Sequence, residues 1–171
     1  GERDHVSITI VSPDPPAPLL GDLKADAALR SALQAHRIEF IPDFPVNKVS
    51  PGEVMTSNGH AMNFNLLMLV PPFQGSPVVL YQGIRDQAYI NVDSTMKVIG
   101  VERMYAVGDC VNFTGPKMGH MAVRQGEVAA ANLAAEIDGH PAVSHYSHEM
   151  RLVIDEGGND SIYVHKDIWT N

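Results

Sequence analysis

The sequence predicts an α/β protein built from two successive parts, and three observations support this prediction. An apolar strand, a long helical segment and a second strand follow one another between residues 6 and 41. Later, a mostly apolar segment ends in Gly108-Asp109 and leads into an Ala-rich helix. With 171 residues and 44% hydrophobic residues, the chain can form one good core or two small ones. We place the boundary near residue 80, which gives domains over residues 1–80 and 81–171.

The first domain opens with a β-α-β unit. Val6–Val11 is predicted to be a buried strand, and the following loop, Ser12 to Pro18, contains four prolines. A helix is predicted over Asp22–His36 and a second strand over Ile38–Ile41. Because a helix connects the strands, they are expected to lie parallel. The predicted apolar face of the helix consists of Leu23, Ala27, Ala28, Leu29, Ala32 and Leu33.

An antiparallel meander and another strand are predicted to complete this domain. The meander strands are Val46–Val49, Glu53–Thr56 and Ala61–Phe64. Asn58-Gly59 favours a tight turn between the last two. Leu66–Val70 is entirely apolar, which is typical of a strand covered on both faces, and Pro71-Pro72 would stop it.

In the second domain, the sequence predicts short strands, one long helix and a final hairpin. The predicted helix, Ala122–Ile137, is stopped by Asp138-Gly139, since glycine readily adopts the left-handed conformation after a helix. A small-residue face is expected to pack against a sheet or a backbone: Ala122, Gly126, Ala129, Ala130, Ala134 and Ile137. The other segments are polar residues around Tyr81–Gln87, strands at Ala88–Val92, Met96–Val98 and Val101–Gly108, and a hairpin of Leu152–Ile154 with Ile162–Val164.

The end of the predicted Val101–Gly108 strand has the features of a cofactor-binding turn. Gly108 permits close approach of backbone, and the Asp109 carboxylate can accept hydrogen bonds from sugar-like hydroxyl groups. Open α/β sheets bind ligands at the carboxyl ends of their strands. The alternative interpretation is that Asp109 has only a structural role, as a turn residue or a helix cap.

Three segments in order resemble the second flavin-binding region of pyridine nucleotide-disulfide oxidoreductase-type flavoproteins: Ile90–Asp93, Met104–Cys110 and Gly115–Ala122. The branch that looks most similar contains the sulfide:quinone oxidoreductases, the flavocytochrome c sulfide dehydrogenases and the type II NADH dehydrogenases. The resemblance implies a partial dinucleotide-binding (Rossmann-like) domain, NAD(P)-binding-like, followed by the carboxyl-terminal part of an FAD-binding domain.

The resemblance also implies FAD as the cofactor. Asp109 would contact the ribityl chain, while Lys117 and the amino end of the helix would stabilise negative charge on the reduced ring. The ordinary alternative for Lys117 is an exposed loop cation. The catalytic residues are not identified. The expected cofactor-binding residues are Gly108, Asp109, Lys117, Met118, Gly119 and His120.

Length suggests that the chain is a carboxyl-terminal portion of such a protein. Complete two-domain members are roughly twice as long, and this sequence contains no Gly-x-Gly-x-x-Gly motif to hold a pyrophosphate. We therefore expect the isolated chain to bind FAD poorly and to be inactive. Its expected partners are the missing N-terminal half of the same protein and a quinone or another small electron acceptor, with a homodimer as a candidate assembly.

The electron donor and acceptor stay open. Sulfide-oxidising members carry a reactive cysteine near the stretch that corresponds to Tyr146–Val153, but Cys110 is the only cysteine here, and it is expected to be a small packing residue. NAD(P)H would need no such thiol. Asp14 could bind a ribose or merely support its Pro-Asp-Pro turn. Gln125 partly matches the Gln-rich helix of type II NADH dehydrogenases that contacts quinone.

Charge and composition exclude several other classes of function. A net charge of −8 disfavours nucleic acid as a partner, and no apolar run is long enough to span a bilayer. A cytoplasmic location is expected, with the full-length protein peripheral to a membrane as an alternative. His140, His145 and His148 match no strong zinc pattern, so no metal site is predicted.

The sequence therefore favours a portion of an FAD-dependent oxidoreductase that carries electrons from NAD(P)H or sulfide to a quinone-like acceptor. The alternative is a noncatalytic dimerisation or interaction module that retains the flavoprotein scaffold. Exposed apolar surface would favour this second hypothesis.

Overall fold

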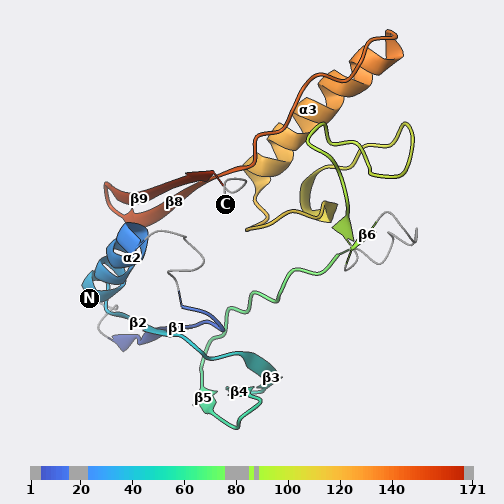
Figure 1. Cartoon of the computed structure of the whole chain (residues 1–171). Helices are drawn as coiled ribbons and strands as arrows, with labels where there is room; N and C mark the ends of the chain where they lie inside the picture. Colours follow the sequence, from blue (N-terminus) through green and yellow to red (C-terminus); the bar gives the residue numbers. More distant parts are fainter. Residues whose placement is uncertain (1–4, 16–22, 76–84, 87–88, 168–171) are drawn as a thin grey trace. The chain divides into compact units, whose positions relative to one another are not determined.

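A computed structural model describes residues 5–15, 23–75, 85–86 and 89–167, and the chain divides into two compact units (Figure 1). One unit comprises Gly1–Val70 with Leu152–Val164, and the other comprises Pro71–Arg151 with His165–Asn171. The first unit combines short strands with one helix. The second is built on a longer helix and the loops packed against it.

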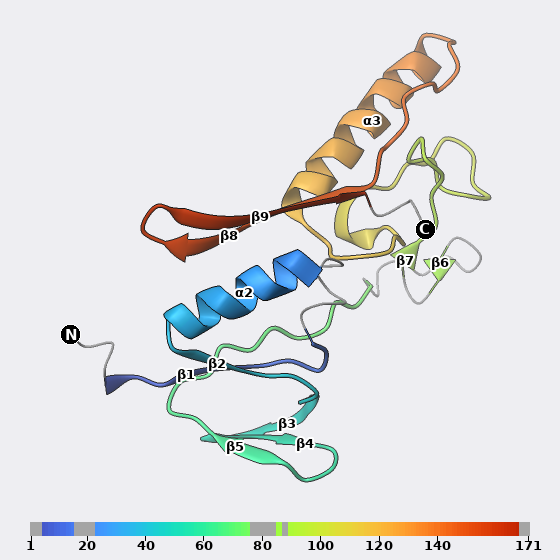
Figure 2. The same ribbon diagram turned by 60° about the vertical axis from the view of Figure 1, so that its left-hand side comes forward.

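The predicted β-α-β unit is confirmed in the first unit, but the burial predicted for its first strand is wrong, since Ile8 and Ile10 are 40% and 41% exposed. Strand β1 (Ile8–Val11) and strand β2 (Ile38–Ile41) pair in parallel, with Ile8 opposite Ile38. Helix α2 (Leu23–Ala35) connects them and packs against β2 (Figure 2). The predicted apolar face is confirmed only in part, because Ala32 is buried whereas the Leu23 side chain at the start of α2 is 79% exposed.

The predicted meander is also confirmed. Strands β3 (Val46–Ser50), β4 (Glu53–Thr56) and β5 (Ala61–Asn63) form an antiparallel three-stranded sheet. The predicted Asn58-Gly59 turn joins β4 to β5, and Gly59 has a positive φ of 85° while its N–H donates to the Thr56 carbonyl. A left-handed φ at this position explains why glycine suits it.

The predicted strand over Leu66–Val70 is wrong. The segment has no regular secondary structure, and Leu66, Met68 and Val70 are 91%, 89% and 73% exposed. An all-apolar strand is stable when neighbouring elements cover both of its faces. Within the residues that the structure describes, no strand pairs with this segment.

In the second unit, the predicted strand over Val101–Gly108 is wrong as well. The chain turns back on itself here: Val98 N–H donates to the Met104 carbonyl, and Ala106 N–H donates to the Met96 carbonyl. Positive φ values at Gly100 and Arg103, 84° and 57°, produce the turn between these segments. The expected strand is therefore one arm of a short loop, and it continues into the 3₁₀ turn η2 (Gly108–Cys110).

Two further short strands precede this loop. Strands β6 (Arg85–Asp86) and β7 (Tyr89–Ile90) pair in an antiparallel manner. The predicted Ala88–Val92 strand is thus reduced to two residues, and Met96–Val98 forms only isolated bridges. Part of the predicted polar stretch, residues 81–84 and 87, and also Ala88, lie outside the described residues.

The long helix is confirmed as α3 (Gly119–Ile137), which begins three residues before the predicted start. It ends at the predicted place, where Gly139 has a φ of 78° and donates to the Glu136 carbonyl. The predicted small-residue face is wrong in part, since Ala130, Ala134 and Ile137 are exposed. The buried face instead includes two amide side chains and consists of Met121, Gln125, Ala129 and Asn132.

The predicted terminal hairpin is confirmed and is longer than expected. Strands β8 (Glu149–Gly157) and β9 (Asp160–Asp167) form a two-stranded sheet, and positive φ values at Gly157 and Gly158 make the turn between them. In the described part of the chain, no helix is long and apolar enough to cross a bilayer.

Candidate functional site

The Gly108–Cys110 turn is held against α3 by a buried hydrogen bond. Gly108 has a φ of 76°, and its N–H donates to Gln125 Oε1 at 2.6 Å. A Cβ at Gly108 would stand 3.5 Å from the Ala122 Cβ, so the turn lies directly on the helix. Gln125 itself is only 1% exposed. These contacts fix the turn that carries Asp109.

The side chains that follow Gly108 point to different environments. Asp109 is exposed, which leaves its carboxylate accessible to a ligand. The Cys110 thiol is half-buried and donates to the Val107 carbonyl at 3.2 Å. An exposed, ionised carboxylate on a fixed turn is suited to accepting hydrogen bonds from hydroxyl groups.

Lys117 lies in an aromatic and carbonyl-lined environment near the same turn. Its Nζ donates to the Val111 carbonyl at 2.7 Å and lies 4.0 Å from the ring centroid of Phe113 and 4.3 Å from that of Tyr89. Burial lowers the pKa of Lys117, and the charge of Asp109 partly opposes this decrease. Lys117 is thus fixed by these contacts, and its charge interacts with that of Asp109.

The amino end of α3 is open to a ligand. Met118, the N-cap residue, makes no side-chain capping bond, although its carbonyl accepts from the N–H groups of Met121 and Ala122. Gly119 is exposed, and a Cβ built there would meet nothing within 4 Å. The His120 ring is half-buried and its Nε2 lies 3.4 Å from the Arg151 backbone nitrogen. Helix amino ends favour negative charge.

A buried polar relay supports the loop that leads to Lys117. His148 is completely buried, and its Nε2 lies 2.6 Å from the Thr114 carbonyl while its Nδ1 lies 3.2 Å from the Tyr146 hydroxyl. Because a carbonyl can only accept, Nε2 donates to the Thr114 carbonyl. Burial raises the pKa of Tyr146, and the neighbouring Gln125 amide partly opposes that rise.

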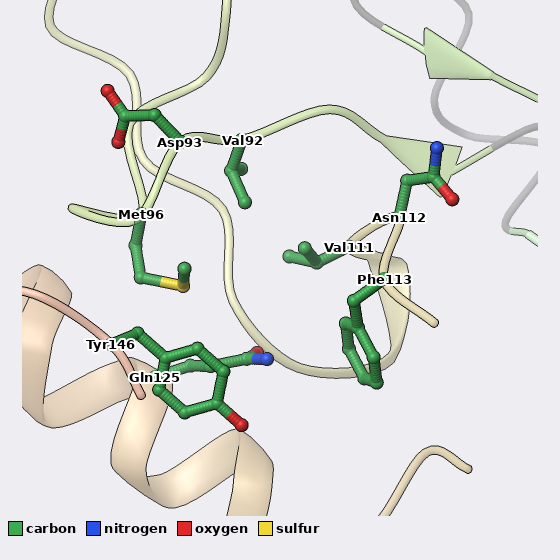
Figure 3. A pocket seen from close by; sticks show the side chains of 8 residues that line it. All are labelled: Val92, Asp93, Met96, Val111, Asn112, Phe113, Gln125 and Tyr146. Atoms are coloured by element: carbon green, nitrogen blue, oxygen red, sulfur yellow. The ribbon is translucent and has the colours of Figure 1, made fainter. Parts of the chain in front are cut away.

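The pocket behind this relay is too small for a flavin. Its volume is about 10 Å³, which is room for about one water molecule. Figure 3 shows its walls, including Gln125 and Tyr146. The lining residues are Val92, Asp93, Met96, Val111, Asn112, Phe113, Gln125 and Tyr146.

The other residues considered as ligands make hydrogen bonds within the chain. The Asp14 N–H donates to Ser12 Oγ at 3.3 Å, in the expected turn. His145 Nδ1 lies 2.9 Å from Ser94 Oγ, whereas His148 belongs to the buried relay. Over the described residues, no three histidine, cysteine, aspartate or glutamate side chains are grouped so that they could hold a metal ion.

Sequence reasoning missed the buried polar residues. Gln125 resembled a quinone-contacting residue, but its side chain is turned inward to Gly108. Asn132 is equally buried and holds the backbone of Thr95 and Ser144. The available signal was an amide pair seven residues apart, which is two helical turns, within an otherwise Ala-rich helix.

Comparison with known structures supports the flavoprotein fold. The chain is similar to the sulfide:quinone oxidoreductase from Aquifex aeolicus, with a TM-score of 0.79 and 19% identity, over 98% of this chain and 44% of that one. It is also similar to an NAD-dependent persulfide reductase from A. fulgidus, with a TM-score of 0.64 and 17% identity, over 85% of this chain and 29% of that one.

Sequence comparison agrees in part. Ferroptosis suppressor protein 1 from Homo sapiens is 22% identical over 135 residues, which cover 76% of this chain and 36% of the relative. The Xenopus laevis protein of the same name is 32% identical over 71 residues, which cover 42% of this chain and 19% of the relative. No protein-family model matches the chain.

The matches span less than half the length of these relatives and solved structures. The mixed α/β arrangement and the order of its elements are nevertheless shared with the sulfide:quinone oxidoreductase over nearly the whole chain. The chain therefore has the fold of part of a flavoprotein oxidoreductase of the pyridine nucleotide-disulfide oxidoreductase type.

Proposed function

We propose that this chain is the carboxyl-terminal part of an FAD-dependent oxidoreductase that passes electrons from a donor to a quinone-like acceptor. Residues 1–80 would be part of an NAD(P)-binding-like domain, and residues 81–171 would be the carboxyl-terminal part of the FAD domain. The observation that carries the proposal is the exposed Asp109 carboxylate, held on α3 through Gly108, with the Lys117 ammonium nearby.

The described residues fit one part of FAD and not the whole molecule. Asp109 would accept a hydrogen bond from a hydroxyl group of the ribityl chain. The N–H groups at the start of α3 and the Lys117 ammonium would stabilise negative charge on the reduced ring. FAD, when bound, supplies the redox chemistry. The pyrophosphate would need a glycine-rich turn from the missing N-terminal half of the same protein.

NAD(P)H is the donor that this proposal favours. The segment Tyr146–Val153 contains no cysteine, and Cys110 donates to a backbone carbonyl. A sulfide-oxidising thiol is therefore not supplied at the place where the resemblance would expect it. Electron transfer from a nicotinamide requires no such thiol.

The test uses the natural full-length protein that contains this chain. We expect flavin absorption bands in the purified protein and their reduction by NADH or NADPH. Asp109→Ala should weaken FAD binding about tenfold, because a charged hydrogen bond is lost. Glu102→Ala, which alters another exposed carboxylate in a turn, is the matched control and should leave the affinity unchanged. A full-length protein that neither retains nor takes up flavin contradicts the proposal.

Lys117→Met provides a second readout that does not depend on turnover. The midpoint potential of the bound flavin should become more negative, because the reduced, negatively charged ring loses a nearby cation. The affinity for oxidised FAD should change little. A potential equal to that of the unmodified protein would remove Lys117 from the proposed site.

The exposed Leu66, Met68 and Val70 side chains favour the alternative, a noncatalytic dimerisation or interaction module. Such a module would associate with itself without flavin uptake. Sedimentation of the full-length protein with and without FAD separates the two functions, since only the oxidoreductase has a flavin-loaded state.

A further inference from the structure

A second, open cavity lies beside the first two turns of α3. Its volume is about 490 Å³, and its lining residues are His120, Val123, Arg124 and Arg151. This volume is within the range of about 300–1,000 Å³ that small-molecule sites occupy. The cavity shares no lining residue with the closed pocket behind Gln125.

The side chains around this cavity carry a net positive charge. The guanidinium groups of Arg124 and Arg151 both contact Glu149 Oε1, and His165 Nε2 lies 2.8 Å from Glu149 Oε2. One carboxylate thus pairs with two permanent cations. This leaves an excess of about one positive charge, without counting His120 or His165. The excess occurs on a chain whose net charge is −8. Glu127, one turn further along α3, does not line the cavity.

Both arginines keep donors for another oxyanion. Each guanidinium has five N–H groups, and the contact with Glu149 joins one nitrogen of each. The Arg124 and Arg151 side chains line the cavity and are 39% and 54% exposed, so both guanidinium groups are accessible to a ligand.

One wall of the cavity is apolar. Val123 stands one residue before Arg124 on α3, and its side chain is 63% exposed. An inorganic ion would leave this valine in water, whereas a ligand with an apolar body would cover it. The combination of two guanidinium groups with an apolar wall selects for an anion attached to a hydrophobic group.

We propose that this cavity binds a small ligand that carries a phosphate or carboxylate group on an apolar body. Arg124 and Arg151 hold the oxyanion, and Val123 contacts the body of the ligand. Arginine is suited to this role because its planar fork matches the oxygen geometry of both groups. The groups that hold the oxyanion, Arg124 and Arg151, are not among the residues proposed to contact FAD, although His120, which is expected near the cofactor, also lines the cavity.

Titration calorimetry at low salt tests the site in the natural full-length protein that contains this chain, with phenyl phosphate as the probe. We expect saturable binding of one equivalent, with at least threefold weaker binding of inorganic phosphate, which lacks the apolar body. Benzoate distinguishes a carboxylate preference from a phosphate preference. Arg124→Gln and Arg151→Gln should each weaken the binding of phenyl phosphate about tenfold, as expected for the loss of a charge-assisted hydrogen bond.

Two further variants separate this site from general charge effects. Arg30→Gln removes an equal charge from α2, where Arg30 pairs with Asp26, and should leave the affinity within twofold. Glu149→Gln should strengthen binding at least threefold, because it removes the carboxylate that competes with the ligand. The proposal is overturned if phenyl phosphate does not bind, if Arg124→Gln and Arg151→Gln bind it as well as the unmodified chain, or if Glu149→Gln weakens binding. Flavin uptake by the full-length protein is unaffected by any of these results.

Discussion

The two described long helices bury their surfaces by different means. Helix α2 buries a single residue, Ala32, and its first residue, Leu23, is 79% exposed. Helix α3 buries four residues, and two of them are the amides Gln125 and Asn132. Both helices are rich in alanine, and leucine occurs three times in α2 and once in α3. The difference lies in what each helix contacts.

In α3, the polar side chains make the structural connections. Gln125 accepts from the Gly108 N–H, and Asn132 bonds to the backbone of Thr95 and Ser144. Loops have backbone groups without partners in regular structure, so an amide on a helix can satisfy them where an apolar side chain cannot. The comparison teaches that a helix that positions loops needs buried amides, whereas a helix that covers a sheet, such as α2, does not.

The largest effect is expected at Asn132. Asn132→Leu removes three hydrogen bonds and leaves the Ser144 N–H unpaired, so the free energy of unfolding should decrease by about 3 kcal/mol. Urea denaturation followed by circular dichroism measures this change. A loss below 1 kcal/mol would show that α3 is held by its apolar residues, as α2 is.

Gln125→Leu should have the next largest effect, because it leaves the Gly108 N–H buried without an acceptor. We expect a loss of about 2 kcal/mol in the free energy of unfolding. Gln34→Leu on the exposed face of α2 is the matched control, and its effect should stay within about 0.5 kcal/mol. Equal effects of the two substitutions would remove the distinction between the helices.

A substitution at Asp93 tests the stability of the loop that Asn132 of α3 contacts at Thr95. Its carboxylate accepts from Thr95 N and Oγ1 and from Lys97 N. Burial alone would raise the pKa of Asp93, but the bonds from Thr95 and Lys97 outweigh burial and hold the pKa below 3.8. Asp93→Asn should cost about 1 kcal/mol at neutral pH.

The pH dependence of this effect has a definite sign. Because the folded pKa is lowered, the stabilisation is fully present above pH 3.8 and is lost as the pH falls through the folded pKa. The difference between the unmodified chain and Asp93→Asn should therefore shrink on acidification. Urea midpoints measured across this interval check the prediction, and a difference that grows toward low pH would contradict it.

The smallest effect is expected at the start of α2. Leu23→Ala should change the free energy of unfolding by less than about 0.5 kcal/mol, because the side chain is already largely in water and alanine has the higher helix propensity. Thermal unfolding is sufficient to measure it. A loss of 2 kcal/mol would show that Leu23 is buried in solution and that the two helices are more alike than their contacts indicate.

Local signals were sufficient to predict most elements from the sequence. The β-α-β unit, the Asn58-Gly59 turn, the long helix and the terminal hairpin depend on neighbouring residues and were confirmed. Leu66–Val70 and Val101–Gly108 were predicted wrongly, because the conformation of an apolar segment depends on partners that are distant in sequence. For the same reason the buried face of α3 was assigned incorrectly.

The candidate site residues could be selected from the sequence, but the contacts that support them could not. Gly108, Asp109 and Lys117 stand out through residue type and order, and the structure places Asp109 and Lys117 within electrostatic reach. The roles of these residues toward FAD stay predictions. The relay through Tyr146 and His148 could not be inferred, since it joins residues more than thirty positions apart.

The apolar run Leu66–Val70 has a consequence for handling the molecule. Five consecutive apolar and uncharged residues form a segment through which exposed chains can associate into aggregates. Pro71 and Pro72, which follow directly, lack the N–H groups that such association requires and so limit its spread along the chain. Concentrated preparations should therefore lose solubility first through this stretch, and removal of the prolines should hasten the loss.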